Sequence, residues 1–117
     1  IERRTGVRVE VLSSLEEARL IGIAAAQFFG ADESSLLNID IGGGSTELSL
    51  MRNGEPEKLF SMKLGAVGLT EQFLFSDPPR AKEIKNLRAE IISALEQPKR
   101  KIKDETWKFS TGTSGTI

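Results

Sequence analysis

The chain has 117 residues, of which 38% are hydrophobic and 28% are charged, and its formal net charge is −1. These values are typical of a globular α/β protein of about one small domain. A charge so close to zero argues against a general binder of DNA or of membrane surfaces, because such proteins need a basic face. No segment reaches the roughly 18 apolar residues of a membrane span.

The sequence contains neither cysteine nor histidine. Disulfides, zinc–thiolate sites and a Ser-His-Asp triad are therefore excluded. Any acid–base or metal chemistry must rest on carboxylates, hydroxyls, lysine, arginine or backbone amides. The lack of cysteine is also compatible with a cytoplasmic protein, which is the location we expect.

The first thirty residues predict a strand followed by a helix. Apolar and polar residues alternate from Val7 to Leu12, which is typical of a strand. The helix is expected from residues 13–17 to about Phe29, with Gly30 as its stop. Its expected apolar stripe consists of Ala18, Ile21, Ala25 and Phe28.

Three strands are predicted next. Residues 36–41 form a short apolar strand that leads directly into a run of glycines, and residues 47–52 resume as a strand. Asn53-Gly54 is a strong hairpin signal. The return strand is expected over residues 58–64.

The last third predicts two helices and a strand. A short helix is expected over residues 70–75, and a long helix opens at residues 77–79 and ends at Pro98. Its expected buried residues are Ile84, Leu87, Ile91 and Leu95. Residues 107–110 are a candidate final strand, so the order of elements indicates an α/β fold with a mixed sheet.

The most informative stretch is DIGGGSTE, residues 40–47. Consecutive glycines allow the backbone to approach an anion and to point its amides toward it, and Ser45 and Thr46 add hydroxyl donors. Asp40 ends the strand and is placed to hold a divalent cation beside phosphates. The stretch lacks the lysine of a P-loop. A tight turn between strands is the alternative interpretation.

Four segments in order resemble motifs of the exopolyphosphatase and guanosine pentaphosphate phosphohydrolase family, within the actin-like ATPase superfamily. They are EEARLI at residues 16–21, DIGGGSTEL at 40–48, LGAVGLTE at 64–71 and GTSGTI at 112–117. The resemblance implies an actin-like ATPase (ribonuclease H-like) fold. It implies a hydrolase that uses Mg²⁺ and acts on polyphosphate or guanosine pentaphosphate, and it is compatible with a homodimeric parent protein.

The resemblance also implies roles for particular residues. Glu17 matches the catalytic glutamate that orients or deprotonates the attacking water, and Asp40 matches an acid associated with Mg²⁺. Glu47 matches a second acid facing the cleft, which could contact metal or water. The residues that match phosphate-binding positions are Gly42, Gly43, Gly44, Ser45, Thr46, Gly112, Ser114 and Gly115.

Several of these residues have an alternative role. Glu17 has capping-box spacing from Ser14, and a carboxylate committed to its own helix cap cannot reach a water. Glu16, with Ser13 as its cap, is then the alternative catalytic residue. Glu47 alternates with Leu48 and could belong only to the polar face of a strand. The basic run at residues 99–103 could guide a polyanion or complement the helix dipole.

The family's first phosphate loop, of the pattern D-x-G-[ST]-N-[ST], does not occur in the sequence. We therefore expect a fragment, in which residues 1–33 end one domain and residues 36–117 begin the next, with the boundary near residues 30–34. Such a piece is expected to be inactive alone. The alternative functions are a non-catalytic module that binds polyphosphate or an alarmone, and a sugar kinase or ATPase of the same fold.

Overall fold

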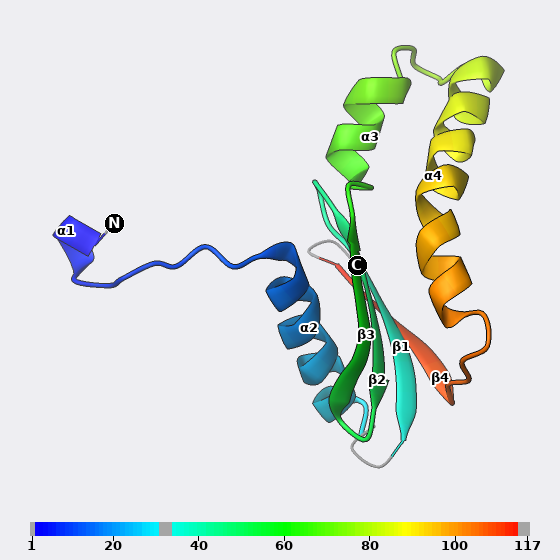
Figure 1. Ribbon diagram of the computed structural model, residues 1–117. Coiled ribbons are helices and arrows are strands. Elements are labelled where there is room, and N and C mark those ends of the chain that lie inside the picture. The colour runs from blue at the N-terminus through cyan, green and yellow to red at the C-terminus, as the bar shows by residue number, and fades with distance from the viewer. Residues whose placement is uncertain (1, 31–33, 115–117) are drawn as a thin grey trace.

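The computed structural model describes residues 2–30 and 34–114, which form four helices and four strands. The helices are α1 (Glu2–Thr5), α2 (Ser14–Phe28), α3 (Ala66–Phe73) and α4 (Ala81–Ile102). The strands are β1 (Ser35–Ile41), β2 (Thr46–Arg52), β3 (Glu55–Met62) and β4 (Phe109–Thr113). The order of elements in Figure 1 confirms the mixed α/β fold that the sequence predicts.

The four strands form one mixed sheet in the order β3-β2-β1-β4. β1, β2 and β3 are an antiparallel meander, whereas β4 returns through α3 and α4 to lie parallel to β1. Asn53 and Gly54 join β2 to β3 with positive φ angles of 53° and 78°. These are the angles that an Asn-Gly hairpin turn requires, so this prediction is confirmed.

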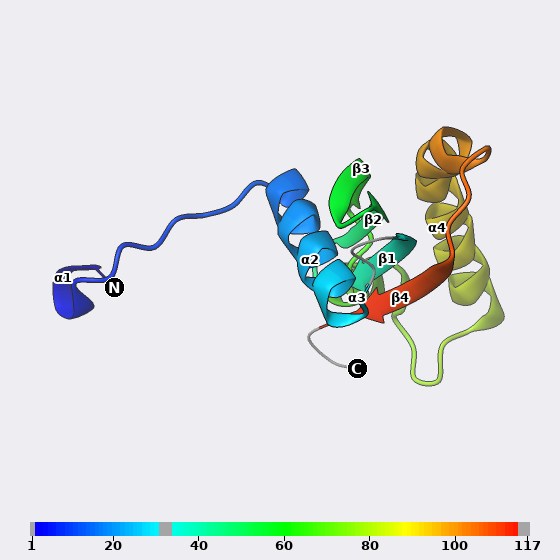
Figure 2. The ribbon, with the colours of Figure 1, turned by 90° about the horizontal axis from the view of Figure 1, so that it is seen from below.

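Helices cover both faces of the sheet, as Figure 2 shows. On one face, Ala26 of α2 packs with Leu36 and Met51, all three fully buried. On the other face, Leu48, Met62 and Leu64 form a second buried cluster, against which Leu69 of α3 and Ile91, Ala94 and Leu95 of α4 pack. The burial of apolar residues on both faces accounts for the three-layer arrangement.

Helix α2 is seated closely on the sheet and runs in the same direction as β2. The Ser49 hydroxyl donates a hydrogen bond of 2.7 Å to the Ala18 carbonyl, near the start of the helix. One turn later, a Cβ atom on Gly22 would lie 2.7 Å from the Met51 sulfur. The absence of a side chain at Gly22 therefore allows the helix to approach β2 closely, with its N-terminus at the end of the sheet where β2 begins.

The sequence-based expectation for residues 7–12 is wrong. In the structure they form an extended arm that carries α1 away from the sheet (Figures 1 and 2). Val11 is 96% exposed, and none of the described strands lies beside the arm. Apolar and polar residues do alternate here, but a strand exists only when a neighbouring strand pairs with its backbone.

Other expected boundaries shift by a few residues, and three details are wrong. Ile84, expected among the buried residues of α4, is 39% exposed. Pro98 lies inside α4 and is buried rather than ending the helix. Packing at this buried position compensates for the amide that proline removes from the helix. Phe28 was expected in the apolar stripe of α2, yet it is 83% exposed, because the helix rests on the sheet through the small residues Ala18, Gly22 and Ala25.

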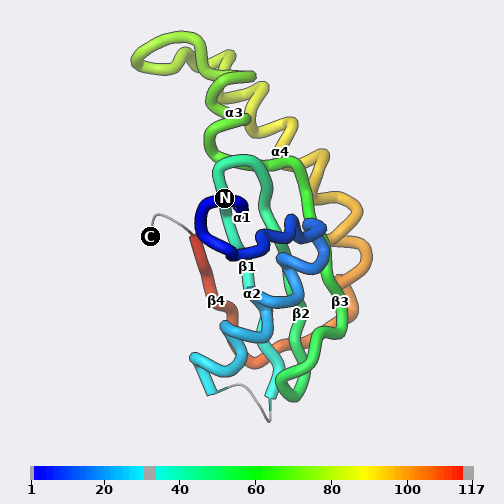
Figure 3. The backbone as a smooth tube through the Cα atoms, turned by 90° about the vertical axis from the view of Figure 1, so that its left-hand side faces the viewer, coloured from blue at the N-terminus to red at the C-terminus, as the bar shows by residue number. Residues whose placement is uncertain are grey.

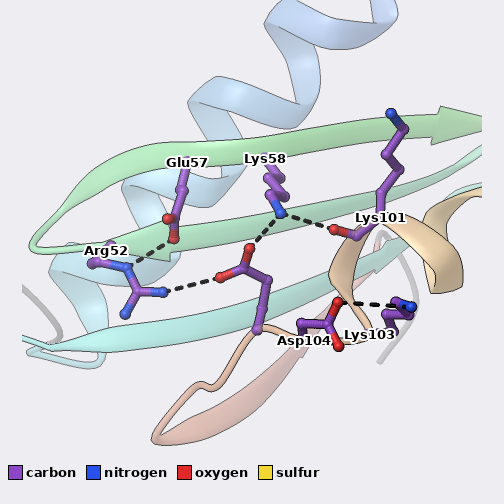
Figure 4. Close-up of polar contacts among 7 residues, drawn as sticks. Arg52, Glu57, Lys58, Lys101, Lys103 and Asp104 are labelled. Carbon is purple, nitrogen blue, oxygen red and sulfur yellow. Dashed lines mark hydrogen bonds and ion pairs between the residues drawn. The ribbon is translucent and has the colours of Figure 1, made fainter.

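A network of charged side chains ties the end of α4 to the β2–β3 hairpin (Figure 4). Lys58 pairs with Glu105 and also donates to the Lys101 carbonyl at 2.8 Å. Arg52 pairs with Glu57 at 2.8 Å and with Glu105 at 3.4 Å. The Lys58 hydrogen bond and then the charges of Lys58 and Arg52 lower the pKa of the Glu105 carboxyl below its ordinary value.

Replacing Gly22 tests how closely α2 is seated. We expect Gly22→Val to lower the free energy of unfolding by about 1–3 kcal/mol, because the new side chain would overlap Met51 and Ser49. Ala24→Val, on the exposed face of the same helix, is the control and should cost only roughly 0.5 kcal/mol. Urea denaturation measures both, and equal losses would contradict this packing.

The Glu105 network predicts a pH-dependent contribution to stability. A carboxylate whose pKa is lowered by folding stabilises the protein above its unfolded pKa of roughly 4.3, and this contribution is lost as the pH falls through the folded pKa. Lys58→Met should therefore lower the melting temperature at pH 7, and the deficit should shrink below about pH 4. Lys85→Met is the control, since Lys85 makes no ion pair within the described residues. A deficit that does not change with pH would contradict the network.

Candidate active site

Four segments meet at one end of the sheet, at the upper end in Figure 1. The parallel strands β1 and β4 both end there, the loop at residues 42–45 connects β1 to β2 there, and α3 begins there. The N-terminus of α2 points to the same end. In open α/β sheets, ligands bind outside the carboxyl ends of the parallel strands, so this end is the candidate site.

The glycine loop is fixed through its carbonyl groups. The amides of Ala66 and Val67, at the start of α3, donate to the carbonyls of Gly42 and Gly43 at 3.0 Å each. The Gly42 amide is also occupied, since it donates to the Ser45 carbonyl at 2.9 Å. The amides of Gly43, Gly44 and Ser45 donate no hydrogen bond to any described residue. The loop thus has bound carbonyls and three available donors, which is what an anion-binding loop needs.

Gly65 permits this docking, and its importance was not predicted. A Cβ atom on Gly65 would lie 2.1 Å from the Gly43 carbonyl oxygen and 2.3 Å from the Gly44 carbonyl carbon. Such contacts are impossible, so the backbone before α3 can touch the glycine loop only when residue 65 is glycine. The contact of Gly65 with a loop twenty residues earlier has no signal in a local pattern.

Packing requires glycine at position 65, but it does not require glycine at positions 43 and 44 of the loop itself. A Cβ atom on Gly44 would meet nothing within 4 Å, and one on Gly43 would make only an ordinary contact with Val67 at 3.5 Å. Neither has a φ angle in the left-handed region that favours glycine. The fold therefore does not need glycine at Gly43 or Gly44, and the open space is available to a ligand that approaches the backbone.

The two hydroxyl residues of the loop differ in their surroundings. Thr46 is 8% exposed, and its hydroxyl donates to the Leu64 carbonyl at 2.6 Å. This donor therefore links the end of the loop to the segment before α3. Ser45 is half-buried, and its hydroxyl has no hydrogen-bond partner among the described residues. Of the two donors that the sequence suggested, Ser45 is the one available to an anion.

Two acidic side chains lie in one row across the sheet, next to the loop. Asp40 of β1 and Glu47 of β2 are directly paired, and Ser61 of β3 pairs with Glu47 on its other side. Glu47 is only 1% exposed and accepts a 2.7 Å hydrogen bond from the Ser61 hydroxyl. Because α2 covers this face of the sheet, Glu47 does not lie on a solvent-exposed surface.

This pair of carboxylates fits a magnesium ion. Residues directly opposite on antiparallel strands have Cβ atoms about 4.5–5.5 Å apart, and two like charges there repel each other. Neither Asp40 nor Glu47 forms an ion pair with any described cationic residue. The described residues contain no group of three or more potential ligands. One or two carboxylates are nevertheless what Mg²⁺ takes from a protein when phosphates and water complete its shell.

The start of α2 leaves Glu17 free. Ser13, not Ser14, caps the helix, and its hydroxyl accepts from the Glu16 amide at 3.2 Å, so the expected capping box of Ser14 with Glu17 is wrong. The Glu16 side chain pairs twice with Arg19, at 2.6 and 2.8 Å, and these hydrogen bonds lower the pKa of Glu16 below its ordinary value. The Glu17 carboxylate is exposed and has no partner among the described residues.

The anchor between α2 and the sheet lies one residue after Glu17. Ala18 accepts the hydrogen bond from Ser49, and Ser49 follows Glu47 by two positions on the same face of β2. Glu17 is therefore carried on a helix turn that is fixed to the strand bearing Glu47. Sequence spacing alone could not place these two acids at the same end of the sheet.

The end of β4 borders the other side of the loop. Asn38 of β1 is 1% exposed and joins the two strands, donating to the Thr113 hydroxyl at 3.2 Å and accepting from Thr111 at 2.8 Å. The Ser114 hydroxyl donates to the Ile41 carbonyl at 2.7 Å. Gly112 is exposed in β4, and Gly115 lies outside the described residues.

A groove of about 740 Å³ lies between the glycine loop and β4. Its walls include Gly42, Gly43 and Val67 on one side and Gly112 and Ser114 on the other. The two phosphate-binding segments that the sequence suggested thus face one another across an open groove. Figure 3 shows β4 at the edge of the sheet, beside β1.

The basic run at residues 99–103 does not belong to this site. It ends α4 and precedes β4, whose first residue pairs with Leu36 near the start of β1. The run therefore lies at the opposite end of the strands from the glycine loop. Near the start of α2, the cationic side chain of Arg19 is paired with Glu16 at 2.6 Å.

Gly65→Ala tests whether the site depends on the close approach of the loop. We expect this change to displace residues 42–45 and to lower the melting temperature, since the new methyl group overlaps the Gly43 carbonyl. Gly68→Ala is the control, because a Cβ atom there meets nothing within 4 Å. Thermal unfolding by circular dichroism measures both variants. Equal melting temperatures for Gly65→Ala and the unchanged protein would contradict the described contact.

The model of the Ppx/GppA phosphatase family matches residues 1–117, the whole chain. Exopolyphosphatase 1 of Mycobacterium leprae is 41% identical over 95 residues, which are 81% of this chain and 28% of that protein. Exopolyphosphatase 2 of Mycobacterium tuberculosis is 35% identical over 114 residues, 96% of this chain and 35% of that protein. The chain therefore spans about a third of the length of these relatives.

The solved structures agree with the fold. The Aquifex aeolicus PPX-GPPA enzyme superposes with a TM-score of 0.80 at 29% identity, over 99% of this chain and 37% of that one. An exopolyphosphatase from Cytophaga hutchinsonii gives a TM-score of 0.79 at 24% identity, which supports the fold alone. The sheet and its helices are thus part of the actin-like ATPase fold that the resemblance of the motifs implies, and the chain belongs to the Ppx/GppA phosphatase family.

Proposed function

We propose that the chain supplies the second phosphate loop and the catalytic carboxylates of a phosphohydrolase. The observation that carries the proposal is a loop with three available backbone amides, at Gly43, Gly44 and Ser45, next to the paired acids Asp40 and Glu47. Hydrolysis of a phosphoanhydride requires neutralised charge and an aligned nucleophile more than covalent chemistry. A site built without histidine or cysteine is sufficient for that purpose.

The amides of the loop would bind the phosphoryl oxygens. The carbonyls of Gly42 and Gly43 are held by α3, so the Gly43 and Gly44 amides, which share those peptide groups, are fixed before a ligand arrives. Donors that are already oriented stabilise the charge of a transition state without the cost of reorganisation. The Ser45 hydroxyl would add a further donor at the edge of the loop.

Glu17 would orient or deprotonate the attacking water. Its carboxylate has no competing partner among the described residues, whereas its neighbour Glu16 is bound to Arg19. The anchor between Ala18 and Ser49 keeps the first turn of α2 at the end of the sheet that bears the loop. Of the two adjacent acids, Glu17 is therefore the better candidate for the base.

Asp40 and Glu47 would hold a magnesium ion. When bound, Mg²⁺ would neutralise charge on the phosphate chain and on the departing phosphate. Relief of the repulsion between these two carboxylates would favour binding of the ion. This role rests on the two acids, since their row contains no third carboxylate in the described part of the chain.

The substrate is proposed to be inorganic polyphosphate, with guanosine pentaphosphate as the alternative. The relatives named exopolyphosphatase support the first, and the family name covers both activities. The chain spans 28–35% of those relatives, so activity is proposed for the complete protein that carries this chain. A homodimer and a cytoplasmic location stay predictions. No helix within residues 2–30 and 34–114 has the length and apolar character needed to cross a bilayer.

The test compares Glu17→Gln with Glu16→Gln in the complete protein. Glu17→Gln should lower phosphate release from polyphosphate with Mg²⁺ by roughly 10²–10⁴-fold, the usual contribution of a general base. Glu16→Gln is the matched control and should retain most activity, because it alters only the contact with Arg19. Substrate binding should persist in both variants.

The other outcomes are equally informative. Equal release by both variants and the unchanged protein would remove Glu17 from the mechanism. Tight binding of polyphosphate without release of phosphate by any form would indicate a binding module instead of an enzyme.

A further inference from the structure

We infer that Ser61 is a positioning residue for the proposed hydrolase site, which it serves by fixing one oxygen of the Glu47 carboxylate. The inference rests on the proposed function. Ser61 lies on β3, outside the glycine loop and outside the helix that carries Glu17. Its only link to the chemistry is its hydrogen bond to Glu47.

The Glu47 side chain has few possible partners. It sits on the central strand β2, between Asp40 on β1 and Ser61 on β3, and it is 1% exposed. Two residues further along the same face, Ser49 is occupied because its hydroxyl donates to the Ala18 carbonyl. Ser61 alone among the described side chains donates a hydrogen bond to Glu47.

This bond has two physical consequences. First, it supplies a donor to a carboxylate that α2 covers, where an unsatisfied charge is costly. Second, it involves Oε1, so the other oxygen, Oε2, remains available on a side chain whose rotation is restricted. A hydrogen bond that holds one oxygen of a carboxylate ligand in place is the usual way in which an outer residue orients a metal ligand.

The positions of the three side chains across the sheet show on which side of Glu47 the hydrogen bond from Ser61 lies. Ser61, Glu47 and Asp40 are successive partners on three adjacent strands, so their side chains emerge from the same face. Ser61 holds Glu47 from the side opposite Asp40. The hydrogen bond therefore holds one carboxylate oxygen on the β3 side and restricts the rotation of the Glu47 side chain next to Asp40.

The test uses the complete protein and the variants Ser61→Ala, Ser61→Thr and Ser76→Ala. Ser76, in the segment before α4, is the matched control, because its hydroxyl also donates a 2.7 Å hydrogen bond to a glutamate, Glu83 of α4. The first measurement needs no substrate: the melting temperature is followed as Mg²⁺ is added. The second is kcat and KM for phosphate release from polyphosphate.

Ser61→Ala should raise the Mg²⁺ concentration needed for half of the thermal shift by about 10–100-fold, the usual effect of removing an outer partner of a ligand. It should lower kcat while KM for polyphosphate stays nearly constant, since the loop amides are unchanged. Ser61→Thr keeps the hydroxyl and should restore both values. Ser76→Ala should behave as the unchanged protein does.

Two further variants test whether Ser61 acts through its hydrogen bond to Glu47. If Ser61→Ala does not fold, Ser61→Cys preserves the size of the side chain but donates only weakly, and it should show the same loss. In a Glu47→Gln background, Ser61→Ala should have no additional effect on kcat.

The outcomes separate this inference from the proposed function. If the unchanged protein shows the thermal shift and releases phosphate, but Ser61→Ala matches Ser76→Ala in both, the role of Ser61 is overturned while the hydrolase stands. If the unchanged protein shows neither response, the proposed function fails and the inference fails with it.

Discussion

The contact between the glycine loop and the start of α3 is the constraint on which the site depends. The carbonyls of Gly42 and Gly43 accept hydrogen bonds from the first amides of α3, and Gly65 is the residue that lets the two backbones approach. The helix N-terminus thus satisfies its unpaired amides with the loop instead of with water or a ligand. In turn, the loop is held with its own amides directed away from the helix and available to an anion.

The positions of the acidic residues are set by the sheet strands on either side of the glycine loop. Asp40 lies two positions before the loop at residues 42–45 and Glu47 two positions after it, and the antiparallel register of β1 and β2 places them opposite one another. Helix α2 then covers Glu47 and carries Glu17 to the same end of the sheet through the bond from Ser49 to Ala18. The domain boundary expected near residues 30–34 stays a prediction. The described part of α2 nevertheless packs directly on the sheet formed by the residues that follow.

Much of the fold follows from local patterns, and the misses have physical causes. The alternation of Leu48 and Leu50, the Asn53-Gly54 turn and the run of glycines after Ile41 predict β1, β2 and their hairpin, because each signal acts over a few residues. Residues 7–12 have equally good strand alternation, but no neighbour pairs with them. Pro98 has a clear local preference, which its buried environment in α4 outweighs.

The loop of the candidate site could be proposed from the sequence, but the residues that hold the loop and the acids in place could not. DIGGGSTE indicates phosphate and metal chemistry from composition alone, whereas Ser61, Ser49 and Gly65 act through partners that lie 14, 31 and 22 positions away. The roles of Glu16 and Glu17 were also open, since both fit a helix start, and only the side-chain partners distinguish them.

The most direct test of the account is a crystal structure of the complete protein with Mg²⁺ and inorganic phosphate. The account predicts a phosphate oxygen about 2.7–3.2 Å from the amide nitrogens of Gly43, Gly44 or Ser45, with the metal between that phosphate and Asp40. Phosphate bound elsewhere, with these amides instead bonded to other protein groups, would contradict it.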